Sequence, residues 1–167
     1  MIQVYTGDGK GKTTAALGLA LRAQGAGLKV YIGQFIKGSS YSELKVLKKI
    51  PNIKIEQYGR GCFIKNKPKQ ADIDLARKGL KRTRQIIAKG NYNLIVLDEI
   101  NVALHLGLLN INEVINLIKS TPKDIELVLT GRWAPPKLIK LANLVSEVKD
   151  IKHYYKRGIR ARKGIEF

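Results

Sequence analysis

The sequence predicts an α/β fold, in which a mostly parallel sheet is covered by helices on both faces. Short apolar runs alternate with helical segments along the chain, and polar or glycine residues follow several of these runs. The chain has 167 residues and shows no linker or internal repeat, so residues 1–167 are expected to form a single domain. In such sheets ligands bind beyond the carboxyl ends of the strands. The polar residues that follow the apolar runs are therefore the candidates for a site.

The first half of the chain is expected to contain three strands and three helices. Apolar or alternating residues predict strands at residues 2–5, 29–35 and 53–58. Helical patterns are predicted at residues 13–24 and 42–50, and a third, long helix ends at Lys89. Asp72 or Asp74 can cap this long helix. The strand at residues 53–58 alternates in polarity, so it is expected at or near an edge of the sheet, and residues 59–70 are expected to form a basic loop near a ligand.

The second half continues the alternation of strands and helices. Strands are predicted at residues 94–97, 126–130 and 144–148, and helices at residues 112–119 and near 135–141. The run at residues 94–97 is fully apolar, which is typical of a buried parallel strand, and Asp98 and Glu99 follow it directly. Arg132 follows the next apolar strand in the same way. All three charged side chains are therefore expected at the carboxyl edge of the sheet.

A glycine-rich segment between the first strand and the first helix matches a P-loop. Gly11, Lys12 and Thr13 occupy the last positions of that motif. Such a loop points successive backbone N–H groups at phosphate oxygens, beside the positive end of the helix dipole. The predicted phosphate contacts are Gly7, Asp8, Gly9, Lys10, Gly11, Lys12, Thr13 and Thr14. The first position departs from the usual pattern, because Thr6 stands where glycine is expected and Gly7 follows it.

The same edge of the sheet carries candidates for binding Mg²⁺ and for neutralising charge. Thr13 offers a hydroxyl to the metal, Asp98 is expected to orient the metal shell, and Glu99 is an alternative or additional ligand. Lys12 is expected to neutralise the phosphates. Arg132 is expected to grip phosphate oxygens, with an ordinary surface arginine as the alternative. These residues by themselves predict the binding of a triphosphate, without naming a reaction.

The chain is strongly basic, with 31 Lys and Arg residues against 13 Asp and Glu residues and a formal net charge of +18. This charge attracts polyanions, so nucleic acid is one candidate partner. The positive charge is dispersed, however, which favours a solvated surface around a site for an anionic small molecule. The basic segment at residues 149–163 contains Tyr154 and Tyr155 and is compatible with binding of a single-stranded nucleic acid.

Other features exclude several classes of protein. The chain contains one cysteine, Cys62, which cannot form an internal disulfide and has no partners at metal-ligand spacing. No apolar run approaches the length of a membrane span, and no secretion signal is recognised, so a cytoplasmic protein is expected. Trp133 has two readings, as a stacking surface for a base or ring and as an anchor at a helix start. His105 lies in an apolar helical stretch and is expected to be a packed or half-exposed helix residue rather than a ligand.

Several segments together resemble the P-loop type of ATP:corrinoid adenosyltransferase. The unusual Thr-Gly opening of the loop, a Gln-Phe-Ile-Lys-Gly block and a Lys-Gly-Ile-Glu-aromatic ending occur together in that family. The resemblance spreads over nearly the whole chain. It is carried by residues 6–16, 34–38, 96–99, 129–132 and 163–167.

The resemblance implies a P-loop (RecA-like) fold and an enzyme that transfers the 5′-deoxyadenosyl group of ATP to the cobalt of a reduced corrinoid, cob(I)alamin or a precursor. Triphosphate leaves, and the reaction serves cobalamin biosynthesis or salvage. It implies ATP as co-substrate, Mg²⁺ as cofactor, a homodimer and a flavoprotein reductant. It assigns Lys12, Arg132 and Glu99 to catalysis. It also implies that the C-terminal tail is a structural segment that closes the fold.

At the corrinoid end the sequence departs from the family pattern. Relatives resemble Gly-Phe-Thr-Trp where this chain has residues 61–64, Gly-Cys-Phe-Ile, so the family tryptophan is absent. Phe63 is the candidate to replace it, and a loop anchor is its other reading. Two other functions follow from the residues alone. One is a P-loop ATPase that binds nucleic acid through its basic surface, and the other is a small-molecule kinase.

Overall fold

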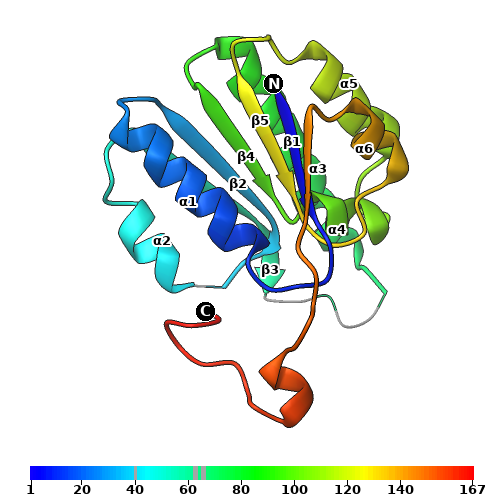
Figure 1. Ribbon diagram of the computed structural model, residues 1–167. Helices are drawn as coiled ribbons and strands as arrows, with labels where there is room; N and C mark the ends of the chain where they lie inside the picture. The colour runs from blue at the N-terminus through cyan, green and yellow to red at the C-terminus, as the bar shows by residue number, and fades with distance from the viewer. Residues whose placement is uncertain (40, 62–63, 65–66) are drawn as a thin grey trace.

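The computed structural model describes residues 1–39, 41–61, 64 and 67–167. Its centre is a six-stranded sheet in the order β3-β2-β4-β5-β1-β6, and every neighbouring pair is parallel (Figure 1). The strands are β1 (Ile2–Thr6), β2 (Val30–Lys37), β3 (Ile53–Gly61), β4 (Leu94–Asp98), β5 (Glu126–Thr130) and β6 (Leu144–Glu147). The predicted fold class is confirmed, and the sheet is wholly parallel within the described residues.

Helices cover both faces of the sheet, as Figure 1 shows. The helices are α1 (Lys12–Gly25), α2 (Ser42–Leu47), α3 (Gln70–Lys89), α4 (Ile100–His105), α5 (Ile111–Ser120) and α6 (Pro136–Leu141). Helices α1 and α2 pack on one face, and the other four pack on the opposite face. This arrangement explains why the inner strands are apolar at successive positions.

Strand β4 shows how the sequence produces these two hydrophobic cores. Leu94 and Val96 pack on the side of α1, whereas Ile95 and Leu97 pack on the side of α3 and α5. Side chains alternate between the faces of a strand, so a strand that is buried on both faces needs an unbroken apolar run. Truncating Leu97, which is fully buried, to alanine would cost about 2–5 kcal/mol of stability.

Helix α3 begins earlier than predicted, because side-chain hydrogen bonds cap it before its apolar pattern starts. The N-cap is Lys69, and Asp72 lies three residues inside the cap, where its Oδ2 accepts the Lys69 N–H at 2.9 Å. The predicted cap at Asp72 or Asp74 was therefore wrong. Strand β3 also continues to Gly61, which shortens the predicted loop, and β3 is an edge strand as expected.

The segment after β6 leaves the sheet and returns across its carboxyl edge (Figure 1). It contains a short 3₁₀ helix, η1 (Tyr154–Arg157), and the Ser42 hydroxyl donates to the Phe167 carbonyl oxygen at 3.0 Å. This segment therefore connects β6 with the start of α2. Among the described residues, no helix is both long enough and apolar enough to cross a membrane.

Candidate functional site

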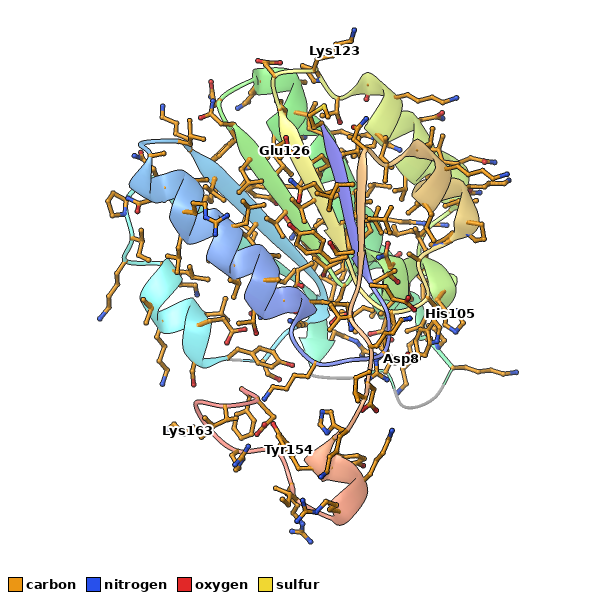
Figure 2. All side chains as sticks on the ribbon, viewed as in Figure 1. Asp8, His105, Lys123, Glu126, Tyr154 and Lys163 are labelled. Atoms are coloured by element: carbon orange, nitrogen blue, oxygen red, sulfur yellow. The ribbon has the colours of Figure 1, made fainter. Side chains whose placement is uncertain are left out.

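The glycine-rich loop joins β1 to α1 at the carboxyl edge of the sheet. Gly11 precedes the helix with φ = 124°, a conformation that side-chain-bearing residues rarely adopt. Helix α1 begins at Lys12 with no side-chain cap and no acidic residue in its first turn. Its terminal N–H groups and dipole therefore remain suited to an anion. Figure 2 shows Asp8 at this edge, whereas Lys123 and Glu126 lie at the opposite end of the sheet.

Lys12 folds back over the loop that it follows. Its Nζ donates hydrogen bonds to the carbonyl oxygens of Gly7 at 2.6 Å and Gly9 at 2.7 Å, and the residue is 7% exposed. Burial lowers the pKa of the Lys12 ammonium, and the nearby positive charge of Arg132 lowers it further, whereas Glu99 opposes this change. A bound polyanion would offset both the burial of the Lys12 ammonium and its repulsion by Arg132. The Lys12 side chain therefore lies within the glycine-rich loop, and its role toward phosphates stays a prediction.

Asp98 organises the floor of the site from the end of β4. Its Oδ1 accepts hydrogen bonds from Thr13 Oγ1 at 2.9 Å and Thr130 Oγ1 at 2.7 Å. Its Oδ2 accepts from Lys37 Nζ at 2.7 Å and Gln34 Nε2 at 3.2 Å. With 1% exposure, the carboxylate is compensated by four donors from three elements, α1, β2 and β5. Asp98 therefore holds the Thr13 hydroxyl in place, and its orienting role toward a metal stays a prediction.

Glu99 follows Asp98 but lies in a different environment. Its backbone has φ = 62°, an uncommon conformation for this residue type, and its N–H donates to Thr130 Oγ1 at 3.0 Å. Among the described residues, none donates a hydrogen bond to its carboxylate. Burial and the neighbouring Asp98 raise the pKa of Glu99, although Lys37, Lys12 and Arg132 oppose that rise. A carboxylate whose charged form is destabilised, and whose oxygens accept no hydrogen bond from the described residues, is suited to bind a cation or a hydroxyl donor.

Arg132 belongs to the loop after β5. This loop packs against Glu99 at the end of β4 and against Thr6 at the start of the glycine-rich loop. A Cβ on Gly131 would lie 3.2 Å from Glu99 Oε2, so glycine allows this loop to approach the acid closely. The Ala134 N–H donates to Thr6 Oγ1 at 3.2 Å, which ties the same loop to the phosphate loop. Arg132 itself is exposed, and its charge influences both Lys12 and Glu99. The predicted meeting of these charged residues is therefore observed.

The chain that follows β6 covers one side of the phosphate loop. The Gly9 N–H donates to the Val148 carbonyl oxygen at 2.7 Å. A Cβ on Gly7 would lie 2.5 Å from that oxygen, and a Cβ on Gly9 would lie 2.6 Å from the Lys149 carbonyl oxygen. Glycine is thus required at both positions by close packing. In this arrangement the Gly9 amide engages Val148, and its predicted contact with phosphate stays a prediction.

Lys10 connects the phosphate loop to the C-terminal tail. Its Nζ donates to Tyr154 Oη at 2.7 Å and to Glu166 Oε1 at 2.8 Å. The Tyr154 hydroxyl also donates to Glu166, and the Arg162 guanidinium lies 4.8 Å from the Tyr154 ring centroid. The Lys10 hydrogen bond holds the pKa of Glu166 well below its usual range, with further help from Tyr154. The tail therefore uses the Lys10 side chain that sequence reasoning assigned to phosphate.

Sequence reasoning missed the donors that surround Asp98. Gln34 lies inside β2, and Lys37 and Thr130 end β2 and β5. Gln34 and Thr130 are fully buried polar residues in largely apolar strands. A polar residue inside an apolar run was the available signal. Of the remaining predicted residues, Asp8 and Thr14 are exposed in the loop and the first turn of α1. Cys62 and Phe63 lie outside the described residues.

Comparisons with known proteins agree with this geometry. The family model described as ATP:corrinoid adenosyltransferase BtuR/CobO/CobP matches residues 1–167. A corrinoid adenosyltransferase of Pseudomonas aeruginosa is 38% identical over 169 residues, spanning 100% of this chain and 83% of the relative. A corrinoid adenosyltransferase of Escherichia coli K12 is 30% identical over 167 residues, spanning 100% and 85%. A KaiC-like protein from Pyrococcus horikoshii shares the fold, with a TM-score of 0.54 at 17% identity over 87% of this chain and 71% of that one.

Proposed function

The chain belongs to the ATP:corrinoid adenosyltransferase family, it uses ATP to adenosylate corrinoids, and we propose that its phosphate loop holds the triphosphate that leaves. The observation that carries this proposal is the contact from Thr13 Oγ1 to Asp98 Oδ1, beside buried Lys12. It joins the start of α1 to the end of β4, as a P-loop site requires. The nucleic-acid ATPase is not favoured by these relatives.

The reaction makes one bond and breaks one bond. The Co(I) centre of the corrinoid substrate supplies an electron pair to C5′ of ATP, which forms the cobalt–carbon bond and leaves cobalt as Co(III). The C5′–oxygen bond breaks, and its electron pair leaves with the triphosphate. No proton has to be removed from the nucleophile, so a general base is unnecessary. The protein's task is to orient C5′ and to stabilise the negative charge that develops on the leaving group.

Lys12 and Arg132 supply that stabilisation from two sides. Lys12 already lies over the loop with its ammonium partly desolvated, so its attraction to phosphate is less screened than that of a surface lysine. Arg132 is exposed next to Glu99 and presents a planar fork that suits phosphate oxygens. The terminal N–H groups of α1 add fixed dipoles. Glu99 is placed to accept a hydroxyl of the ribose or to bind a cation.

The residues present fit a magnesium ion. Mg²⁺ is bound by one or two carboxylates together with the phosphates of the substrate, rather than by a full protein cage. Thr13 offers a hydroxyl that Asp98 orients, and the Glu99 carboxylate accepts no hydrogen bond within the described part of the chain. Thr13 and Glu99 would hold the ion, with Asp98 supporting Thr13. The ion would supply further neutralisation of the triphosphate.

The corrinoid end of the site rests on the family resemblance. Phe63 and its neighbour Cys62 lie outside the described residues, so the role of Phe63 in displacing the lower axial ligand stays a prediction. A homodimer, a flavoprotein reductant and a cytoplasmic location are further predictions of the same kind. None of them is needed for the phosphate chemistry that the described residues support.

The decisive experiment identifies both products. The protein is incubated without oxygen with ATP, Mg²⁺ and chemically reduced cobalamin, and adenosylcobalamin is followed by its light-sensitive absorbance. Chromatography then identifies the phosphate product. We expect adenosylcobalamin and triphosphate in equal amounts. ADP would indicate a kinase or an ATPase, and orthophosphate release that polynucleotide stimulates would indicate a nucleic-acid-dependent ATPase.

A further inference from the structure

A groove next to the phosphate site has no role in the chemistry described above. Its volume is about 730 Å³, and it lies between the end of α4, the start of α5 and the segment that leads into α6. Trp133 and His105 line it, and their rings stack with centroids 4.3 Å apart and planes at 29°. Trp133 is nevertheless 50% exposed, so much of its surface is accessible to a ligand although His105 stacks on the ring.

The backbone at Trp133 is unusual for a large aromatic residue. Its φ is 57°, in the left-handed region that bulky side chains seldom adopt. Such conformations persist where the surrounding structure imposes them, and they concentrate at ligand-binding sites. Here the imposed geometry presents the indole ring to the groove. Packing alone would not require so large a residue to stay 50% exposed.

The loop that carries Trp133 is joined to the phosphate site at two points. The Ala134 N–H donates to Thr6 Oγ1, at the start of the phosphate loop. Gly131 packs against Glu99, and α4 runs from the residue after Glu99 to His105. Figure 2 shows His105 and Asp8 at the same end of the sheet. The aromatic pair is therefore connected to the start of the phosphate loop through Thr6 and to Glu99 through α4.

We propose that Trp133, supported by His105, is the stacking surface for the adenine base of ATP. The proposal rests on the proposed ATP-dependent function, and it extends the site from the phosphates to the base. Adenine is planar and stacks well on indole, whereas the phosphates have charged partners elsewhere in the loop. Arg132 lies directly before Trp133 in the chain, so one short segment would hold both ends of the nucleotide. This assigns Trp133 a binding role in place of a simple helix anchor.

The sequence contains a single tryptophan, which makes a direct test possible. Indole fluorescence of the full chain is titrated with ATP, with CTP and with tripolyphosphate, each with Mg²⁺ and without corrinoid. We expect ATP to quench the emission strongly, because adenine stacks on the ring. CTP should quench less, and tripolyphosphate should bind without quenching. Equal quenching by tripolyphosphate and ATP would overturn the proposal, as would calorimetric binding of ATP without any change in emission.

A kinetic test uses Trp133→Ala, with Trp133→Phe to retain an aromatic face and Val46→Ala as a control. Val46 is an exposed apolar residue on α2. We expect the KM for ATP to rise about 5- to 150-fold in Trp133→Ala, and Trp133→Phe to recover much of that loss. The inhibition constant of tripolyphosphate and the KM for corrinoid should not change. The control should match the unmodified protein in every measurement.

Two results would overturn the adenine assignment while leaving the adenosyltransferase function intact. One is a Trp133→Ala protein with a normal KM for ATP. The other is a raised KM for corrinoid with ATP unaffected, which would move the aromatic pair to the corrin ring. Failure of the unmodified protein to form adenosylcobalamin would instead contradict the proposed function. The fluorescence titration does not depend on turnover, so it still tests the stacking of adenine.

Discussion

The Thr6 hydroxyl accepts a hydrogen bond from the Ala134 N–H at 3.2 Å, and this contact joins the first residue of the phosphate loop to the loop after β5. P-loops ordinarily have glycine at this position, which cannot make such a contact. The departure from the motif therefore has a structural explanation. It couples the phosphate loop to the segment that carries Arg132.

Replacing Thr6 with glycine should lower activity, although it restores the usual motif. The expected loss in kcat/KM for ATP is about 2- to 12-fold, which corresponds to one lost hydrogen bond. Thr6→Ser keeps the hydroxyl and should stay close to the unmodified protein. Steady-state kinetics of all three proteins provide the test. Equal or higher activity of Thr6→Gly would show that the contact with Ala134 has no functional role.

Lys12→Ala should weaken the binding of tripolyphosphate by about 10- to 150-fold, because a hydrogen bond to a charged group contributes about 1.5–3 kcal/mol. Calorimetric titration in the presence of Mg²⁺ measures this loss. Lys29→Ala is the matched control, since it removes the same charge from an exposed position at the amino end of β2. If both variants lost affinity equally, general electrostatic attraction rather than the loop would explain binding.

The ion pair of half-buried Lys37 and buried Asp98 provides a prediction about stability. Lys37→Met leaves the Asp98 carboxylate buried without its cation, which should cost about 3–5 kcal/mol of unfolding free energy. Urea unfolding without Mg²⁺ and nucleotide measures this cost. Lys45→Met, at an exposed position on α2, is the control. The double variant Lys37→Met with Asp98→Asn should lose less than the sum of the single variants. If the losses of the two single variants simply added up in the double variant, Lys37 and Asp98 would not stabilise each other.

Glu99→Gln should stabilise the protein at neutral pH while lowering its activity. Burial, followed by the charge of Asp98, raises the pKa of Glu99 above its ordinary value of 4.5 in the folded state. Below pH 4.5 the carboxyl is protonated in both states, so the two proteins should be about equally stable. As the pH rises from 4.5 through the folded pKa, the unfolded state ionises first and the unmodified protein loses stability.

Urea unfolding at a series of pH values, without nucleotide and metal, measures this difference. The advantage of Glu99→Gln should grow upward from pH 4.5 and then become constant. A constant difference at every pH would indicate that the ionisation of Glu99 does not matter for stability. Adenosylation by this variant should fall by about tenfold or more, because a carboxylate next to the cation and the ribose is lost.

Local patterns were sufficient to predict the strands, most of the helices and the phosphate loop, whereas the short helix α4 was not among the predicted elements. Periodicity predicted all six strands, because burial on one or both faces imposes a recognisable alternation of apolar residues. The spacing of Gly11, Lys12 and Thr13 between a strand and a helix identified the loop, since those residues act within one short segment. The boundaries of α3 were less predictable, because the Lys69 cap depends on the Asp72 side chain.

The sequence by itself thus determined the fold class, the phosphate loop and the family, while the tertiary structure decided which distant side chains meet. Asp98 receives Thr13, Lys37 and Thr130 from three other elements. Lys10 is held by the tail, and Thr6 is held by Ala134. These contacts depend on strand order and on the path of the chain after β6. No local periodicity encodes them, because residues far apart in the chain become neighbours only when the sheet has formed.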